Sequence, residues 1–325
     1  MDKKLRICTI GGGSGMPVVN RALVRAGFGN ISSIVTTFDS GGDTGRMRTD
    51  ERGSVLAFSD YWRSLISLWK DGKKRVVWGE MLSWRDGRGR NFGNIFFQFM
   101  AEKSGSLGEV DSLFEKLVDV KLRGRVIPVA SKPADICFST LSGKKYRGEH
   151  NLDDLRMSLD QVTKIWLEPR VKANDEAIEA VLKAEVVIIC PGSMYGSVLV
   201  NFLPTGMVGA YRKSRARKLL MTNIMSSANE NDNYNQDDYK MLFAKYLGGG
   251  KFFDLVVMAD LKVLSGRRLK RVLKLYEWEH SYPIKFYKKS YQKTLLVDVA
   301  IIEEKNDRLR HSEIKLANFF EKVKI

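Results

Sequence analysis

The chain has 325 residues, of which 44% are hydrophobic, 28% are charged and only 7 are proline. This composition excludes disordered, collagen-like and low-complexity proteins, and the chain is long enough to bury a large core without metal or disulfide staples. Lysine and arginine exceed aspartate and glutamate by 16, but no zinc-finger spacing or RNA-binding aromatic motif accompanies this charge, so we expect no nucleic-acid partner. The three cysteines form no C-x-x-C pair, and we therefore expect a reduced, cytoplasmic location.

Apolar runs rich in β-branched residues alternate with helical patterns along the chain. In chain order, the predicted strands are 5–10, 31–38, 125–129, 164–167, 185–190, 218–225, 255–259 and 294–301. The predicted helices are 17–26, 53–69, 91–102, 110–118, 175–183, 237–247, 267–275 and 313–323. Near-continuous hydrophobic strands are typical of a sheet that is covered on both faces. The alternation predicts an α/β, Rossmann-like fold with a mostly parallel sheet and helices on both faces.

Three segments depart from this alternation. The region of about 47–122 lacks a convincing strand and predicts a helical insertion after the second strand, within a single domain of residues 1–325. Residues 186–211 carry no charge, but proline and glycine interrupt this segment, so we expect no membrane span. Residues 229–238 form the most polar segment and predict an exposed loop.

The strongest local signal follows the first predicted strand and opens a helix. It consists of Gly11, Gly12, Gly13, Ser14 and Gly15. Glycines let backbone N–H groups approach a phosphate closely, and a helix N-terminus adds partial positive charge. The loop is neither a Walker A motif nor a complete G-x-G-x-x-G, and a tight structural turn remains the alternative. We predict an anion-binding loop.

Two further loops support a nucleotide site. After the second strand, Asp39 stands where an acidic residue commonly binds ribose hydroxyls or a metal ion, and Arg46 could clamp a phosphate; Gly41, Gly42 and Gly45 lie between them. After a later strand, a second helix opens at a loop of glycine and hydroxyl residues that contains Gly192, Ser193, Tyr195 and Ser197. Because the carboxyl ends of parallel strands meet at one edge, the three loops together predict a nucleotide or diphosphate site.

The histidines and Ser193 predict neither a zinc site nor a hydrolase site. His150, His280 and His311 are far apart and have no cysteine pair nearby, so we predict no zinc site. Ser193 lacks the G-x-S-x-G elbow of a hydrolase nucleophile.

At these loops the sequence resembles the CofD/YvcK family, which joins 2-phospho-L-lactate transferases to YvcK-type gluconeogenesis factors. The resemblance rests on six segments that run in family order and end near Asn229, namely 11–15, 39–48, 89–94, 124–128, 190–197 and 223–227. The segment 190–197 is closest to the YvcK branch. The resemblance implies that Asn94 and Asn223 join the loop residues in binding a nucleotide.

The sequence departs from the family pattern at several polar positions. Ser40 replaces the second Asp of a carboxylate pair, and Ser54 replaces the Asp of a Pro-Pro-Gly-Asp-x-Arg-Asn segment. Carboxylates are the ligands that Mg²⁺ prefers, so we expect Asp39 to have too few acidic neighbours for a strong cation site. The preserved glycines favour retained ligand binding over retained transferase chemistry.

The resemblance therefore implies a YvcK-like protein that binds a nucleotide sugar or another nucleoside diphosphate and is linked to gluconeogenesis and cell-shape control. The alternative is a CofD-like transferase that moves a 2-phospholactyl group from a guanosine diphosphate donor to a deazaflavin acceptor. In that case Asp39 and Asp43 would be catalytic and lie near Mg²⁺. The base and sugar of the ligand are left open, and so is assembly into a homo-oligomer.

Overall fold

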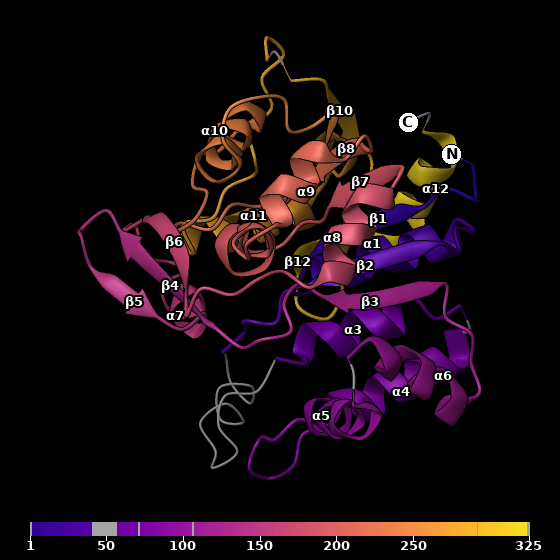
Figure 1. Cartoon of the computed structure of the whole chain (residues 1–325). Coiled ribbons are helices and arrows are strands. Elements are labelled where there is room, and N and C mark those ends of the chain that lie inside the picture. Colours follow the sequence, from indigo (N-terminus) through magenta and orange to yellow (C-terminus); the bar gives the residue numbers. More distant parts are fainter. Residues whose placement is uncertain (1, 41–56, 71, 106, 291, 324–325) are drawn as a thin grey trace.

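The computed structural model describes residues 2–40, 57–70, 72–105, 107–290 and 292–323. Within these ranges the chain folds around seven strands that all pair in parallel, in the order β10-β9-β8-β7-β1-β2-β3 (Figure 1). The strands are β1 (Ile7–Gly11), β2 (Ile31–Val35), β3 (Gly124–Pro128), β7 (Val186–Ile189), β8 (Arg217–Met221), β9 (Leu255–Ala259) and β10 (Thr294–Val297). The predicted α/β fold with a parallel sheet is confirmed.

Alternate residues of each central strand face different layers of the core. In β7, Val187 and Ile189 pack against α8 (Asp175–Lys183), α9 (Met207–Lys213) and α10 (Gln236–Leu247). Val186 and Ile188 pack on the opposite face, against α1 (Gly15–Arg25), α3 (Ser59–Ser67) and α12 (Glu313–Lys322). The continuous apolar run of β7 is therefore explained by helices on both faces, as predicted.

The predicted helical insertion is also present. Between β2 and β3 the described residues form α3, α4 (Gly72–Ser83), α5 (Phe92–Ser104) and α6 (Val110–Val118), which lie below the sheet in Figure 1. Phe97 and Phe114 are fully buried in this insertion, with ring centroids 5.5 Å apart. The assignment of residues 1–325 to one domain stays a prediction.

The prediction for residues 164–167 was wrong about the partner sheet. The strand β6 (Val162–Glu168) pairs antiparallel with β4 (Asp135–Thr140), which also pairs with β5 (Lys145–Arg147). These three strands form a separate sheet, on the left in Figure 1. The helix α7 (His150–Asp154) lies between β5 and β6 in the chain. The hairpin strand β5 is short and largely exposed, so no apolar run in the sequence revealed it.

Two other predictions are corrected. The predicted strand 294–301 divides into β10 and β11 (Ala300–Glu303), and β11 pairs antiparallel with β12 (Arg308–His311) beside α11 (Arg267–Trp278). The segment 229–238 is not an exposed loop, since Asn229, Glu230, Asn231 and Gln236 are buried. Each of these four side chains makes at least one hydrogen bond within the protein.

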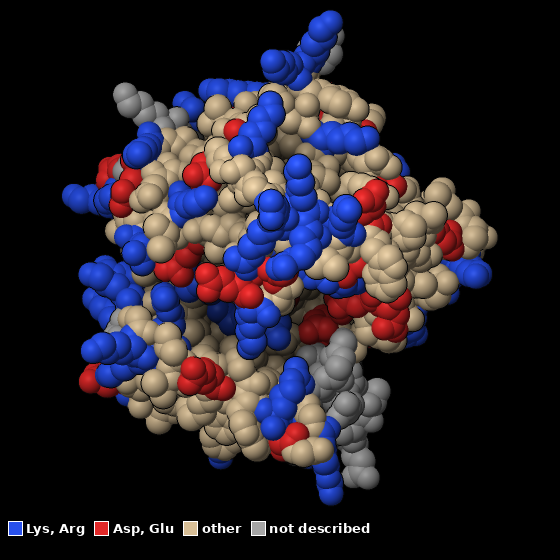
Figure 2. Space-filling view, turned by 180° about the vertical axis from the view of Figure 1, so that it is seen from behind, with Lys and Arg blue, Asp and Glu red and all other residues tan. Residues whose placement is uncertain are grey.

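Within the described ranges, no helix combines the length and the apolar character that a membrane-spanning segment requires. The net charge of +16 is unevenly distributed on the surface. On the face opposite to the view of Figure 1, acidic side chains gather in a band across the middle, with lysine and arginine above and below it (Figure 2).

Candidate functional site

The order of the strands in the sheet indicates where a ligand site is expected. The chain continues from β1 to β2 and β3 on one side, and from β7 to β8, β9 and β10 on the other, so the order reverses between β1 and β7. Ligands of open α/β sheets bind in the crevice that such a reversal creates at the carboxyl ends of the strands. The predicted loops after β1 and β7 lie at this point.

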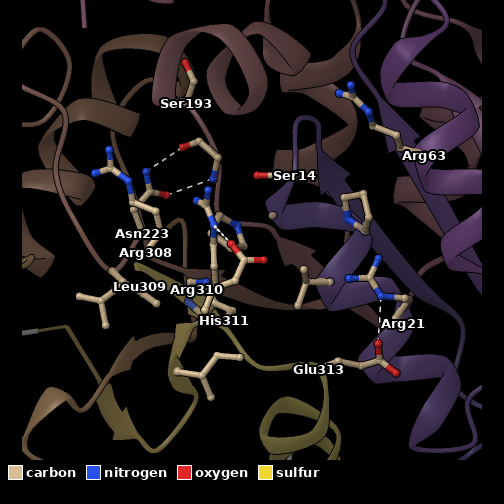
Figure 3. A pocket seen from close by; sticks show the side chains of 18 of the residues that line it. Ser14, Arg21, Arg63, Ser193, Asn223, Arg308, Leu309, Arg310, His311 and Glu313 are labelled. Carbon is tan, nitrogen blue, oxygen red and sulfur yellow. Dashed lines mark hydrogen bonds and ion pairs between the residues drawn. The ribbon is translucent and has the colours of Figure 1, made fainter. Parts of the chain in front are cut away.

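A cavity of about 1080 Å³ opens beside these two loops. Ser14 and Gly15 from the first loop line it, together with Gly192, Ser193 and Asn223. In Figure 3, Arg21 and Arg63 lie on one side of the cavity, and Ser193, Asn223, Arg308 and Arg310 lie on the other. Among the described residues, the lining contains six arginines and four glutamates, which are Arg21, Arg63, Arg75, Arg156, Arg308, Arg310, Glu80, Glu279, Glu303 and Glu313.

The sequence did not predict these arginines. Five of them lie in α1, α3, α4 and β12, and Arg156 follows the end of α7. None belongs to a glycine-rich motif. Arg308 donates to both carboxylate oxygens of Glu279, and its guanidinium lies 5.0 Å from the ring centroid of Tyr276. His311 also lines the cavity, and burial lowers its pKa to about 4, so it is neutral at pH 7.

The two loops touch one another at Gly15. A Cβ atom on this residue would lie 2.1 Å from the carbonyl oxygen of Pro191, so only glycine allows the first turn of α1 to approach the second loop this closely. Gly13 has a φ of +61°, which other residues rarely adopt. The first loop is therefore shaped by requirements of the fold as well as by any ligand.

A carboxyl group of the protein accepts a hydrogen bond from one backbone N–H of the first loop. The N–H of Gly13 donates to the side chain of Asp60, which is 6% exposed and lies at the start of α3. Burial, reinforced by the charge of Asp39, raises the pKa of Asp60 to about 6, while the Gly13 bond and Arg63 oppose this shift. The Arg63 guanidinium lies 3.8 Å from Asp60 and faces the cavity.

A second carboxyl group accepts two hydrogen bonds from the loop after β7. Glu230 accepts hydrogen bonds from the Ser193 hydroxyl at 2.5 Å and from the Met194 N–H at 2.7 Å. Burial raises the pKa of Glu230 to about 7. Asn223 exchanges two hydrogen bonds with the backbone of Gly192, at 3.0 and 2.9 Å, so it braces this loop.

Three other predicted residues are buried and bond or pack within the protein. The Tyr195 hydroxyl donates to the carbonyl oxygen of Val162 at 3.0 Å inside the core. Asn94 accepts a hydrogen bond from the indole nitrogen of Trp62 at 3.0 Å, and Trp62 itself lines the cavity. Ser197 is 7% exposed and packs between the loops that follow β1 and β7. None of the three lines the cavity, and their roles as direct ligand contacts stay predictions.

Asp39 has more acidic neighbours than the sequence indicated. It accepts a hydrogen bond from the Ser59 hydroxyl at 2.6 Å and also interacts with Glu149. Burial and the charges of Asp39 and Asp153 raise the pKa of Glu149 well above its ordinary value, which favours its protonated form. The sequence did not show these neighbours, because Asp60 and Glu149 come from α3 and the edge of α7, far from the motif of Asp39. The expectation that Asp39 forms no strong cation site stays a prediction.

The described residues contain no group of three His, Cys, Asp or Glu side chains placed to hold a metal ion. The remaining predicted site residues lie outside the described residues: Gly41, Gly42, Asp43, Gly45 and Arg46.

The family model for 2-phospho-L-lactate transferase CofD matches residues 7–303. The chain belongs to this family. A protein of Aquifex aeolicus, provisionally named a gluconeogenesis factor, is 33% identical over 285 residues, which are 83% of this chain and 82% of the relative. The gluconeogenesis factor of Listeria monocytogenes is 29% identical over 253 residues, or 76% and 75% of the two chains.

Solved structures of relatives share the fold. A protein of the UPF0052 family from Bacillus halodurans superposes with a TM-score of 0.83 at 26% identity, covering 97% of this chain and 99% of the other. A second crystal structure from the same organism gives a TM-score of 0.84 at 25% identity. The resemblance predicted from the motifs is thus confirmed at the level of family and fold. Arg308, Arg310 and His311 lie beyond the matched residues.

Proposed function

We propose that this protein binds a nucleoside diphosphate, in the form of a nucleotide sugar, in the cavity between the loops after β1 and β7. We further propose that it acts as a ligand-binding protein of the gluconeogenesis-factor type rather than as a transferase. The observation that carries this proposal is the position of an arginine-lined cavity at the reversal of strand order, where Ser14 and the first turn of α1 face it.

The chemistry of the cavity fits a diphosphate. The N-terminus of α1 supplies N–H donors and the positive end of the helix dipole, and Ser14 does not cap this helix with its own side chain. Arg63 adds a guanidinium that is held over the ring of Trp62, at 5.4 Å from its centroid. The cavity volume of about 1080 Å³ is slightly above the usual range for small-molecule sites, which leaves room for a sugar beyond the diphosphate.

A metal-assisted transferase is the second candidate, because the carboxyl groups of Asp39, Asp60 and Glu149 gather beside the first loop. These acids are not arranged as a metal-ligand group in the described part of the chain, so we assign no reaction step to Mg²⁺. The family's acids replaced by Ser40 and Ser54 also favour binding without transfer.

The test is a titration by calorimetry with UDP-glucose, UDP-N-acetylglucosamine, GDP-mannose and GDP, each with and without Mg²⁺. We expect at least one nucleotide sugar to bind, and Arg63→Gln to weaken it about tenfold or more by removing a charged hydrogen-bond donor. Arg215→Gln removes an exposed arginine that does not line the cavity, and it should leave the affinity unchanged. Equal affinities of the wild type and Arg63→Gln would place the ligand elsewhere.

A further inference from the structure

The cavity has a second end, which lies away from the glycine loops. It follows one face of α1, where Ser14, Val18 and Arg21 line it at successive turns. Arg21 lies seven positions after Ser14, the N-cap of α1, which corresponds to about 10 Å along the helix axis. Figure 3 shows Arg21 and its partner Glu313 on the side of the cavity away from Ser193.

Among the described residues, three arginines gather around one glutamate at this second end. Three guanidiniums surround the carboxylate of Glu313 at the start of α12: Arg21 Nε at 3.0 Å, Arg25 Nη1 at 3.8 Å and Arg75 Nη2 at 4.0 Å. The side chains of Arg21 and Arg75 are 29% and 21% exposed, and both residues line the cavity. A single carboxylate cannot neutralise three cations.

The partial burial makes this imbalance costly. Burial lowers the pKa of Arg21, and the charge of Arg75 acts in the same direction, while Glu313 opposes both. Guanidiniums removed from water are stabilised by a further anion, and their planar fork matches the two oxygens of a carboxylate. Arg21 and Arg75 both border the open space of the cavity, where a bound ligand could supply a further anion beside Glu313.

We propose that Arg21 and Arg75 form a second anion subsite, which binds a carboxylate on the sugar of the nucleotide-sugar ligand. The proposal rests on the proposed function and specifies it: the preferred ligand is an acidic nucleotide sugar, with its diphosphate at the first turn of α1 and its carboxylate at Arg21. The separation along α1 sets the order of these groups in the ligand.

A matched pair of ligands tests the proposal. UDP-glucuronate differs from UDP-glucose only by a carboxylate in place of a hydroxymethyl group. We expect calorimetry to show that the wild type binds UDP-glucuronate about tenfold or more tightly, the scale of one or two charged hydrogen bonds. Arg21→Gln and Arg75→Gln should each reduce this ratio of the two affinities towards one.

Arg25→Gln is the matched control. It removes another arginine that lies near Glu313, but Arg25 is 54% exposed and does not line the cavity, so the preference should persist. Equal binding of the two sugars by the wild type, or a preference that survives both cavity variants, would overturn the subsite.

A separate measurement decides the subsite if neither uridine ligand binds, an outcome that would count against the proposed function for uridine nucleotides. Inorganic phosphate should then raise the melting temperature of the wild type more than that of the double variant Arg21→Gln/Arg75→Gln, by mass action on a folded-state anion site. Equal rises in the two proteins would refute the subsite.

Discussion

Asp60 provides a quantitative test of the arrangement around the first loop. Its carboxyl group is buried, accepts the Gly13 N–H and lies near Asp39, and its pKa is about 6 instead of the ordinary 3.8. Between these two values the folded protein holds a proton that the unfolded chain releases. The stabilisation from this proton is complete below pH 3.8 and is lost as the pH rises through 6. At 1.36 kcal/mol per pKa unit, the shift of two units corresponds to about 3 kcal/mol.

The perturbation is Asp60→Asn, which is neutral at every pH and keeps an oxygen that can accept the Gly13 N–H. The free energy of unfolding of the wild type, minus that of the variant, should fall by about 3 kcal/mol between pH 3.8 and pH 7. Urea denaturation followed by circular dichroism at several pH values measures both. Taking the difference cancels the contributions of other buried acids, including Glu230, whose pKa is raised to about 7.

Asp111→Asn offers a comparison in the same helical insertion. Burial raises the pKa of Asp111 to about 7, so its difference curve should continue to fall up to about pH 7, one unit beyond that of Asp60. A difference between wild type and Asp60→Asn that stays constant from pH 4 to pH 7.5 would refute the reasoning. It would mean that Asp60 is hydrated and does not lie against the first loop.

Two further predictions concern the loops. Gly15→Ala should destabilise the fold by about 1–3 kcal/mol and weaken nucleotide binding, because its Cβ would overlap the backbone of Pro191. Gly209→Ala in α9 is the control. No atom lies within 4 Å of a Cβ there, so this substitution should stabilise the fold by about 0.5–1 kcal/mol. Thermal and urea unfolding measure both, and a neutral Gly15→Ala would show that the two loops do not touch. Asp39→Asn should cost about 1–3 kcal/mol of ligand binding, the scale of one charged hydrogen bond to a ribose hydroxyl. The loss should be equal with and without Mg²⁺, because the described acids near Asp39 form no metal-ligand group. A far larger loss only in the presence of Mg²⁺, seen by calorimetry, would instead favour the transferase.

A substitution at Gly13 also tests the first loop, but it combines two effects. A side chain there would have to adopt a φ of +61°, so Gly13→Val would strain the backbone in addition to blocking a phosphate. Gly15 retains an ordinary backbone conformation within α1, and its substitution therefore reports mainly on the contact between the loops.

The sequence alone determined the elements whose signal is local. The run Val186 to Ile189 predicted a strand covered on both faces, because every residue of such a strand must be apolar. Glycines directly after β1 predicted a loop that opens a helix, because only residues without a side chain permit its turn and close contacts. These patterns also carried the family resemblance, since they extend along a continuous stretch of chain.

The tertiary structure decided which groups meet. Asp60 and Glu230 come from segments far from the loops whose N–H groups they accept, so the sequence could not show that these donors are partly occupied. Arg21 and Arg75 are ordinary helical positions until packing brings them to Glu313, about 290 residues after Arg21 in the chain. The strand β5 is too short and too exposed to leave an apolar pattern, although its partner β4 directly precedes it in the chain. Local periodicity thus specifies the sheet and its loops, whereas the charges that surround the cavity depend on contacts between distant segments.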